Sequence, residues 1–132
     1  MSAHDLEARC ALREEDARAR ELAQREFDKP VVLVAGAGTG KTTALVARVI
    51  AWSLGPGWQR AAASARSARD ERGDRIAVRV LRGVVAITFT EMAASEMSER
   101  IGAALLALET GEWPLGLRES AALPGPEALR ER

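Results

Sequence analysis

The sequence predicts an α/β fold, in which helices cover both faces of a parallel β-sheet. Two short apolar runs carry this prediction, residues 31–34 (VVLV) and 84–88 (VVAIT). Neither run alternates apolar with polar side chains, so each indicates a strand buried on both faces. A helical pattern follows each run, as the strand–helix units of a parallel sheet require. We therefore expect a three-layer domain, of which this chain holds an incomplete part.

Helices are expected at three places. Residues 7–26 combine Ala, Glu, Arg and Leu with interleaved charges, which favours one or two solvated helices ending before Pro30. Residues 41–54 place apolar side chains at helical spacing until the Gly-Pro-Gly stop that follows. Residues 91–108, after the capping residue Thr90, carry an apolar stripe at spacings of three and four. That stripe predicts packing against a core.

The remaining segments are less regular. Residues 58–75 are poor in large apolar side chains and are expected to form a mobile insertion or a marginal helix. Residues 76–81 (IAVRVL) predict a short helix or an extended lead-in to the second strand. From Gly111 onward, proline and glycine recur every few residues, which predicts a loop-rich tail.

Charge and composition restrict the class of protein without identifying a partner. The 19 basic and 19 acidic residues cancel, but residues 58–82 hold seven arginines against three acids. The single cysteine, Cys10, excludes an internal disulfide framework and fits a reducing cytoplasm. His4 is the only histidine, so neither metal ligation nor acid–base catalysis by paired histidines is expected. No signal peptide or apolar run of membrane length is apparent, and we expect a soluble cytoplasmic protein without a membrane partner.

The strongest motif is AGAGTGKT at residues 35–42. It matches the phosphate-binding pattern G-x-x-x-x-G-K-[ST], except that Ala35 holds the first glycine position. Glycines leave backbone N–H groups free to face a phosphate, and the following helix adds its N-terminal donors and dipole. Lys41 is expected to contact the β- and γ-phosphates of ATP, and Thr42 to bind Mg²⁺ through its hydroxyl. The predicted nucleotide-binding set comprises Ala35, Gly36, Ala37, Gly38, Thr39, Gly40, Lys41, Thr42 and Thr43, with Lys41 as its catalytic member.

Two other interpretations of this loop are weaker. A dinucleotide-binding fingerprint, G-x-G-x-x-G, begins well at Gly36 and Gly38 but requires glycine where Lys41 stands. A glycine-rich turn with a chance lysine would not explain the complete motif between a strand-like run and a helix. The motif alone does not distinguish kinases, GTPases, ATPases and helicases.

A second motif narrows the choice. Taken together, AGAGTGKTTALVARV and AITFTEMAASEMSERI resemble motifs I and Ia of the UvrD/Rep-type superfamily 1 DNA helicases. The long polar insertion between them resembles the RecB/AddA-like branch. This resemblance implies an ATP-driven motor on DNA, built from RecA-like P-loop domains, in which Thr88, Phe89 and Thr90 contact the DNA strand. The residues alone equally allow Phe89 to be a core residue and the threonines to be helix caps.

The resemblance also implies features that are altered or missing here. Met92 stands where many relatives have lysine. The glutamine that reads adenine has no certain counterpart; Gln24 is the nearest candidate, with Asp16 and Arg18 as alternatives. No apolar strand ending in Asp-Glu, no identifiable arginine finger and no second motor domain follow. We therefore expect the first part of a longer helicase, inactive in ATP hydrolysis without the remaining helicase domains.

The predicted organisation has three parts. Residues 1–29 form an N-terminal helical segment, residues 30–110 a partial RecA-like ATP-binding domain with a mobile insertion at 55–75, and residues 111–132 a truncated tail. Two rival functions remain open. A small complete P-loop kinase or NTPase would need Glu91 as its acid and arginines from residues 60–82 as its lid. A non-catalytic DNA-binding module would use the same arginines as a basic face.

Overall fold

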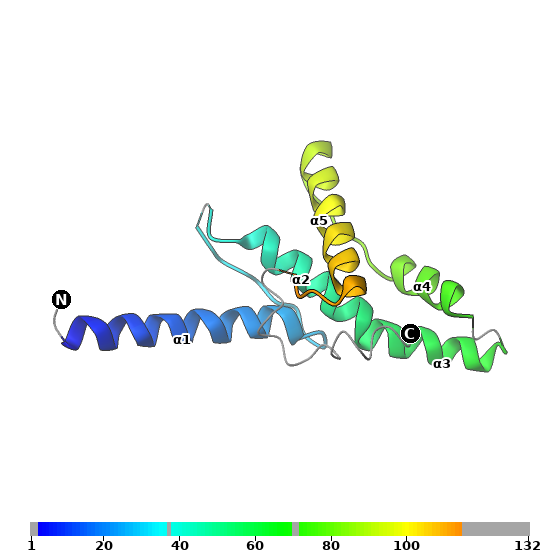
Figure 1. Cartoon of the computed structure of the whole chain (residues 1–132), viewed down its shortest axis with the longest axis horizontal. Helices are drawn as coiled ribbons and strands as arrows, with labels where there is room; N and C mark the ends of the chain where they lie inside the picture. Colours follow the sequence, from blue (N-terminus) through cyan, green and yellow to red (C-terminus); the bar gives the residue numbers. More distant parts are fainter. Residues whose placement is uncertain (1–2, 37, 70–71, 115–132) are drawn as a thin grey trace.

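The computed structural model describes residues 3–36, 38–69 and 72–114. Within these ranges the chain forms five helices and no strand. Figure 1 shows α1 reaching away from the rest of the molecule, and α2 lying centrally between the other helices. The helices are α1 (Ala3–Arg25), α2 (Lys41–Leu54), α3 (Pro56–Ser67), α4 (Gly73–Arg82) and α5 (Glu91–Thr110).

The predicted α/β fold is therefore wrong for the described chain. Residues 31–34 and 84–88 are not helical, as expected, but neither joins a β-ladder. Most of their apolar side chains face solvent instead of a core, with Val34 90% and Ile87 89% exposed, whereas Val31 and Val84 are half-buried. β-Branched residues favour extended backbone, but a strand also needs a neighbour that pairs with its N–H and C=O groups. Within the described ranges no segment pairs with either run, so the three-layer parallel sheet does not form.

The predicted helices are confirmed. α1 ends at Arg25, before Pro30, and α2 ends at Leu54, before the Gly-Pro-Gly stop. The hydroxyl of Thr90 accepts a hydrogen bond from the N–H of Ala93 at 3.1 Å, and so caps α5 as the sequence predicts. Residues 56–67 form the helix α3, the second of the two structures expected for that segment. Pro56 serves as its first residue, where a missing N–H costs nothing.

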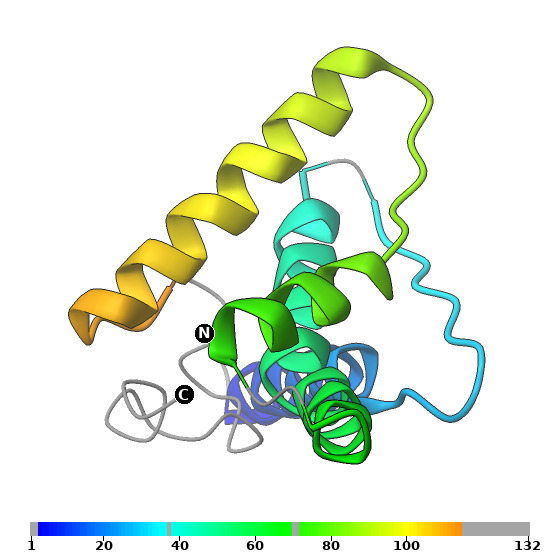
Figure 2. The ribbon, with the colours of Figure 1, turned by 90° about the vertical axis from the view of Figure 1, so that its right-hand side faces the viewer.

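Two small cores hold the helices together. One joins α2 to α5 and consists of Val46, Ala47, Ile50, Ala51, Met97, Ala104 and Leu108. The other joins α3 to α4 through Ala61, Ala65, Ile76 and Val80. Figure 2 shows α5 crossing beside α2 while α3 and α4 lie together as a pair. α2 thus contacts α1, α3 and α5, and it is the element on which the candidate site is built.

The exposed faces follow the sequence patterns only in part. Residues 4–19 of α1 are exposed throughout, as expected for a solvated helix, and burial begins at Ala23. In the predicted stripe of α5, Met97, Ala104 and Leu108 are buried but Leu105 remains 36% exposed. None of the described helices has the length and apolarity needed to cross a membrane. The predicted tail lies mostly outside the described residues, which end at residue 114.

Candidate functional site

The glycine-rich loop leads directly into α2. Gly38 (φ 74°) and Gly40 (φ 87°) both adopt the left-handed conformation, which residues with a side chain rarely adopt. Gly40 is also the N-cap of α2, so the turn at this residue connects the loop directly to the first turn of the helix. Among the described residues Arg69 is the only non-glycine residue at positive φ. Alanine at position 35 is therefore accommodated without strain, whereas Ala37 lies outside the described residues.

The side chain of Lys41 turns back over this loop. Its Nζ donates hydrogen bonds to the carbonyl oxygens of Ala35 at 2.8 Å and Gly36 at 2.6 Å. The hydroxyl of Thr39 donates to the same Gly36 oxygen at 2.7 Å. The loop carbonyls thus hold the ammonium group against the loop backbone, at the start of α2. This brings a positive charge to the place where the motif predicts phosphate.

The first turn of α2 adds to this positive environment. A helix leaves its first N–H groups without intrahelical partners and carries a partial positive charge at that end. The first bond of the helix runs from the N–H of Ala44 to the oxygen of Gly40, at 2.9 Å. No acidic residue lies in this turn, and Thr42 and Thr43 are half-buried in it. The turn is suited to bind an anion, and the Thr42 hydroxyl is an oxygen donor of the kind that Mg²⁺ prefers.

Helix α1 supplies a contact that the sequence analysis missed. The guanidinium of Arg20 donates to the oxygen of Thr39 at 3.3 Å and pairs with Asp16 at 2.8 Å. An Asp–Arg pair four residues apart on a predicted helix was the available signal, but nothing in the sequence indicated that it faces the loop. A cavity of about 100 Å³ lies at this junction, lined by Asp16, Ala19, Arg20, Leu33, Val34, Ala35, Thr39, Gly40, Lys41 and Ala44.

The three candidates for adenine recognition differ in their position relative to this cavity. Asp16 lines the cavity, but Gln24 and Arg18 do not. Gln24 is 7% exposed near the end of α1, and Arg18 faces solvent. The cavity is smaller than the roughly 300–1,000 Å³ of pockets that enclose a whole small ligand. The cavity is therefore large enough to enclose only part of a nucleotide.

A second arginine that the sequence analysis missed fixes the other end of α1. Arg48 of α2 donates to the oxygens of Ala23 and Glu26, each at 2.6 Å. Its guanidinium also lies over the ring of Phe27, 4.8 Å from the ring centroid. These bonds satisfy carbonyl groups at the C-terminal end of α1, which lack intrahelical partners. The signal in the sequence was one arginine within the apolar pattern of residues 41–54.

The predicted DNA-contacting residues lie on the segment between α4 and α5. Phe89 is fully exposed, so its alternative assignment as a core residue is wrong. Thr88 is half-buried and Thr90 is exposed, and Thr90 also caps α5. The neighbouring residue Met92 is 80% exposed. An aromatic face and hydroxyl groups are thus presented to solvent together.

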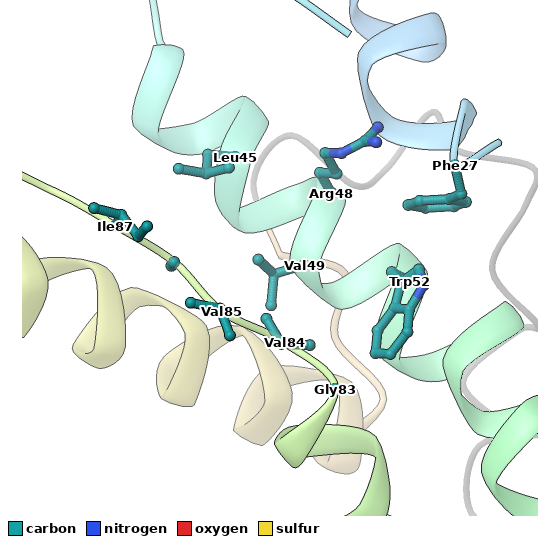
Figure 3. Close-up of a pocket in the computed structure, with 10 residues that line it drawn as sticks. Phe27, Leu45, Arg48, Val49, Trp52, Gly83, Val84, Val85 and Ile87 are labelled. Carbon is teal, nitrogen blue, oxygen red and sulfur yellow. The ribbon is translucent and has the colours of Figure 1, made fainter. Parts of the chain in front are cut away.

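An open groove runs beside the start of this segment. Figure 3 shows residues 84, 85 and 87 passing Leu45 and Val49 of α2, with Trp52 toward the Gly83 end. The groove has a volume of about 380 Å³, and Phe27 and Arg48 also line it. It does not include the residues that line the smaller cavity. In the described ranges, no three His, Cys, Asp or Glu side chains come together as a metal-binding group.

Comparison with known proteins gives one match. Residues 16–122 match the protein family described as UvrD/REP helicase N-terminal domain. The matched range includes the glycine-rich loop, α2 and the segment of residues 84–90. No curated protein and no solved structure matches the chain.

Proposed function

Because the chain belongs to the UvrD/REP helicase family, we propose that it supplies the ATP-binding portion of a DNA helicase. ATP and Mg²⁺ bind at the loop of residues 35–43, within the segment 30–110 that follows the N-terminal helical segment. The observation that carries this proposal is the position of Lys41, whose ammonium is held by loop carbonyls at 2.8 and 2.6 Å beside the N-terminus of α2. Gly40, which directly precedes Lys41, adopts the left-handed conformation, and this loop geometry supports the same function.

Each part of the loop has a role in this proposal. Phosphate oxygens replace the carbonyls of Ala35 and Gly36 as partners of the Lys41 ammonium. The N–H groups at the start of α2 donate to the same phosphates, as helix N-termini do in other phosphate sites. The hydroxyl of Thr42 binds Mg²⁺, which also coordinates the phosphates and offsets their negative charge. The small cavity beside Arg20 receives a phosphate group, and the nucleoside extends beyond it.

DNA is the second ligand in the proposal. Thr88, Phe89 and Thr90 contact a single strand, since an exposed aromatic ring can stack on a base and hydroxyls can donate to phosphates. The observation in favour is that the ring of Phe89 is fully exposed. An exposed ring contributes nothing to a hydrophobic core, so it is available to contact a partner. The long segment between the two motifs supports assignment to the RecB/AddA-like branch.

Translocation and unwinding belong, in this proposal, to the parent protein with its remaining helicase domains. Hydrolysis needs a carboxylate to position water and a cation to stabilise charge on the transferred phosphoryl group, in addition to Lys41 and Thr42. The loop motif provides neither of these. We therefore expect the 132-residue chain to bind ATP without rapid turnover, and turnover of about 1 s⁻¹ that depends on Lys41 would favour a small complete NTPase instead.

The deciding experiment uses the two lysines of the chain. Lys41→Ala should weaken binding of a non-hydrolysable ATP analogue with Mg²⁺ by roughly 10- to 150-fold, since a hydrogen bond to a charged group contributes about 1.5–3 kcal/mol. Lys29→Ala removes the other lysine, which is exposed and lies outside the loop, and should leave the affinity unchanged. Isothermal titration measures both affinities, and circular dichroism confirms that each variant retains its helices. Equal affinities for the wild type and Lys41→Ala would rule out the assignment.

A further inference from the structure

Helices α3 and α4 form a hairpin that carries much of the basic charge of the chain. They run in opposite directions (Figure 1), and Ala61 and Ala65 on α3 pack against Ile76 and Val80 on α4. Residues 58–82, which span the hairpin, hold seven arginines against three acids, and Asp74 is the one of these acids that lies in the described part. Arg72 already engages that acid, at 3.0 Å, and this hydrogen bond lowers the pKa of the Asp74 carboxyl. Asp74 therefore stays ionised beside Arg72, and by sequence the hairpin keeps an excess of positive charge.

The arginines of α4 lie on one side of that helix. Arg75, Arg79 and Arg82 are spaced at i, i+4 and i+7, which places them on one face, beside the buried residues Ile76 and Val80. They span seven residues, or roughly 10 Å along the helix axis. Arg75 and Arg82 are exposed and Arg79 is half-buried. The positive charges thus follow the length of the helix along one line.

A hydrogen bond joins this line of charge to α3. Nη1 of Arg79 donates to the hydroxyl of Ser64 at 3.2 Å. Arg60 stands four residues before Ser64 and therefore lies one turn along the same face of α3. The basic face of the hairpin consists of Arg60, Arg75, Arg79 and Arg82. Arg66 lies on another side of α3, because six residues of helix rotate it by about 240° from Arg60.

We propose that this basic face binds the sugar–phosphate backbone of nucleic acid, at a place separate from Thr88, Phe89 and Thr90. Guanidinium groups match the geometry of phosphate oxygens, and a row of them suits a polymer that presents phosphates in series. A helicase-family chain has nucleic acid as its substrate, so this polyanion is the partner that the charge fits. The contact involves phosphates alone, and it is independent of base sequence.

Salt dependence tests the proposal directly. A fluorescently labelled single-stranded oligonucleotide is titrated with the full chain between 50 and 200 mM NaCl, without ATP, and binding is followed by anisotropy. Changing Arg75, Arg79 and Arg82 together to Gln should lower the slope of log K against log[salt] by about 2, because each lost phosphate contact on a single strand contributes about 0.7. Over this fourfold change in salt, the wild type should lose roughly 16-fold more affinity than the variant.

Two controls and a second test variant make the outcome specific. Changing Arg9, Arg13 and Arg18 of α1 to Gln removes the same charge from an exposed helix and should leave the slope unchanged. The single variant Arg60→Gln, on α3, should lower the slope by about 0.7 even if the triple variant of α4 folds poorly. Lys41→Ala should bind the oligonucleotide like the wild type, so a failure of the ATP assignment is distinguishable. Equal losses in the α1 and α4 triple variants, or an unchanged slope in the α4 triple variant or in Arg60→Gln, would overturn the proposal.

Discussion

Replacing Arg48 by methionine should destabilise the contact between α1 and α2 more than any other single change to a charged residue in this region. The substitution keeps an unbranched apolar stem that can pack on the helix surface. It removes the two donors that bind the oxygens of Ala23 and Glu26, each at 2.6 Å. It also removes the cation that lies 4.8 Å from the centroid of the Phe27 ring.

The magnitude follows from these three contacts. A hydrogen bond from a charged donor contributes about 1.5–3 kcal/mol, and a partly exposed cation–π contact about 0.5–1 kcal/mol. Ala23 is buried, so its carbonyl is poorly placed to gain water, whereas Glu26 is only half-buried and its carbonyl can be rehydrated. Counting the bond to Ala23 in full, leaving out the bond to Glu26 and adding the cation–π contact gives a loss of about 2–4 kcal/mol in the free energy of unfolding.

Urea denaturation followed by circular dichroism measures this loss. With a slope of about 2 kcal/mol per molar urea, the midpoint should fall by about 1–2 M. Arg48→Lys should fall between the wild type and Arg48→Met, because one ammonium lacks the fork that reaches both carbonyls. Arg18→Met, on the exposed face of α1, should change stability by less than about 0.5 kcal/mol. A change no larger than that for Arg48→Met would refute the role assigned to Arg48.

Other substitutions test the loop, the cap and the exposed ring. Gly40→Ala places a residue with a Cβ at a backbone φ of 87° and should cost about 1–2 kcal/mol of stability in the same urea assay. Gly36 is not at positive φ, so Gly36→Ala should cost clearly less. Thr90→Ala should cost about 1 kcal/mol through loss of the α5 cap and Thr90→Ser should restore it; equal stability of all three proteins would exclude capping. Phe89→Ala should leave stability within about 0.5 kcal/mol, since the ring is fully exposed, but weaken single-stranded DNA binding by about 1–3 kcal/mol in an anisotropy titration; unchanged DNA binding would exclude stacking.

The helices could be predicted because their signals are local. Pro30, the Gly-Pro-Gly stop and Thr90 each act on residues within one or two turns, so the sequence specifies where α1 and α2 end and where α5 begins. A strand is different, because its stability depends on a partner that is distant in sequence. The runs at residues 31–34 and 84–88 have the composition of buried strands, but in the described chain their side chains are largely exposed and no ladder forms.

The candidate site shows the same division. Lys41 and the glycines of the loop could be identified from spacing, since the motif encodes a backbone turn and one charge. Arg20 and Arg48 could not, because their roles depend on how α1 packs on α2. Arg20 is one of five arginines in α1, and Arg48, the one arginine of α2, has no local partner that would indicate its contacts. Phe89 could not be placed either: the same aromatic residue fits a core or a surface contact, and only its exposure separates the two.

Two arginines hold α1 in place, Arg20 against the loop and Arg48 against α2, and the difference in strength between their bonds bears on how the loop can work. The bond from Arg20 to the oxygen of Thr39 is 3.3 Å long and exposed, near the limit of useful geometry and open to water, so it contributes little. The bonds from Arg48 are 2.6 Å long and partly buried. α1 is therefore fixed at its C-terminal end and held weakly at the loop. Lys41 can leave the carbonyls of Ala35 and Gly36 for phosphate, and the loop can adjust, without displacing α1 from α2.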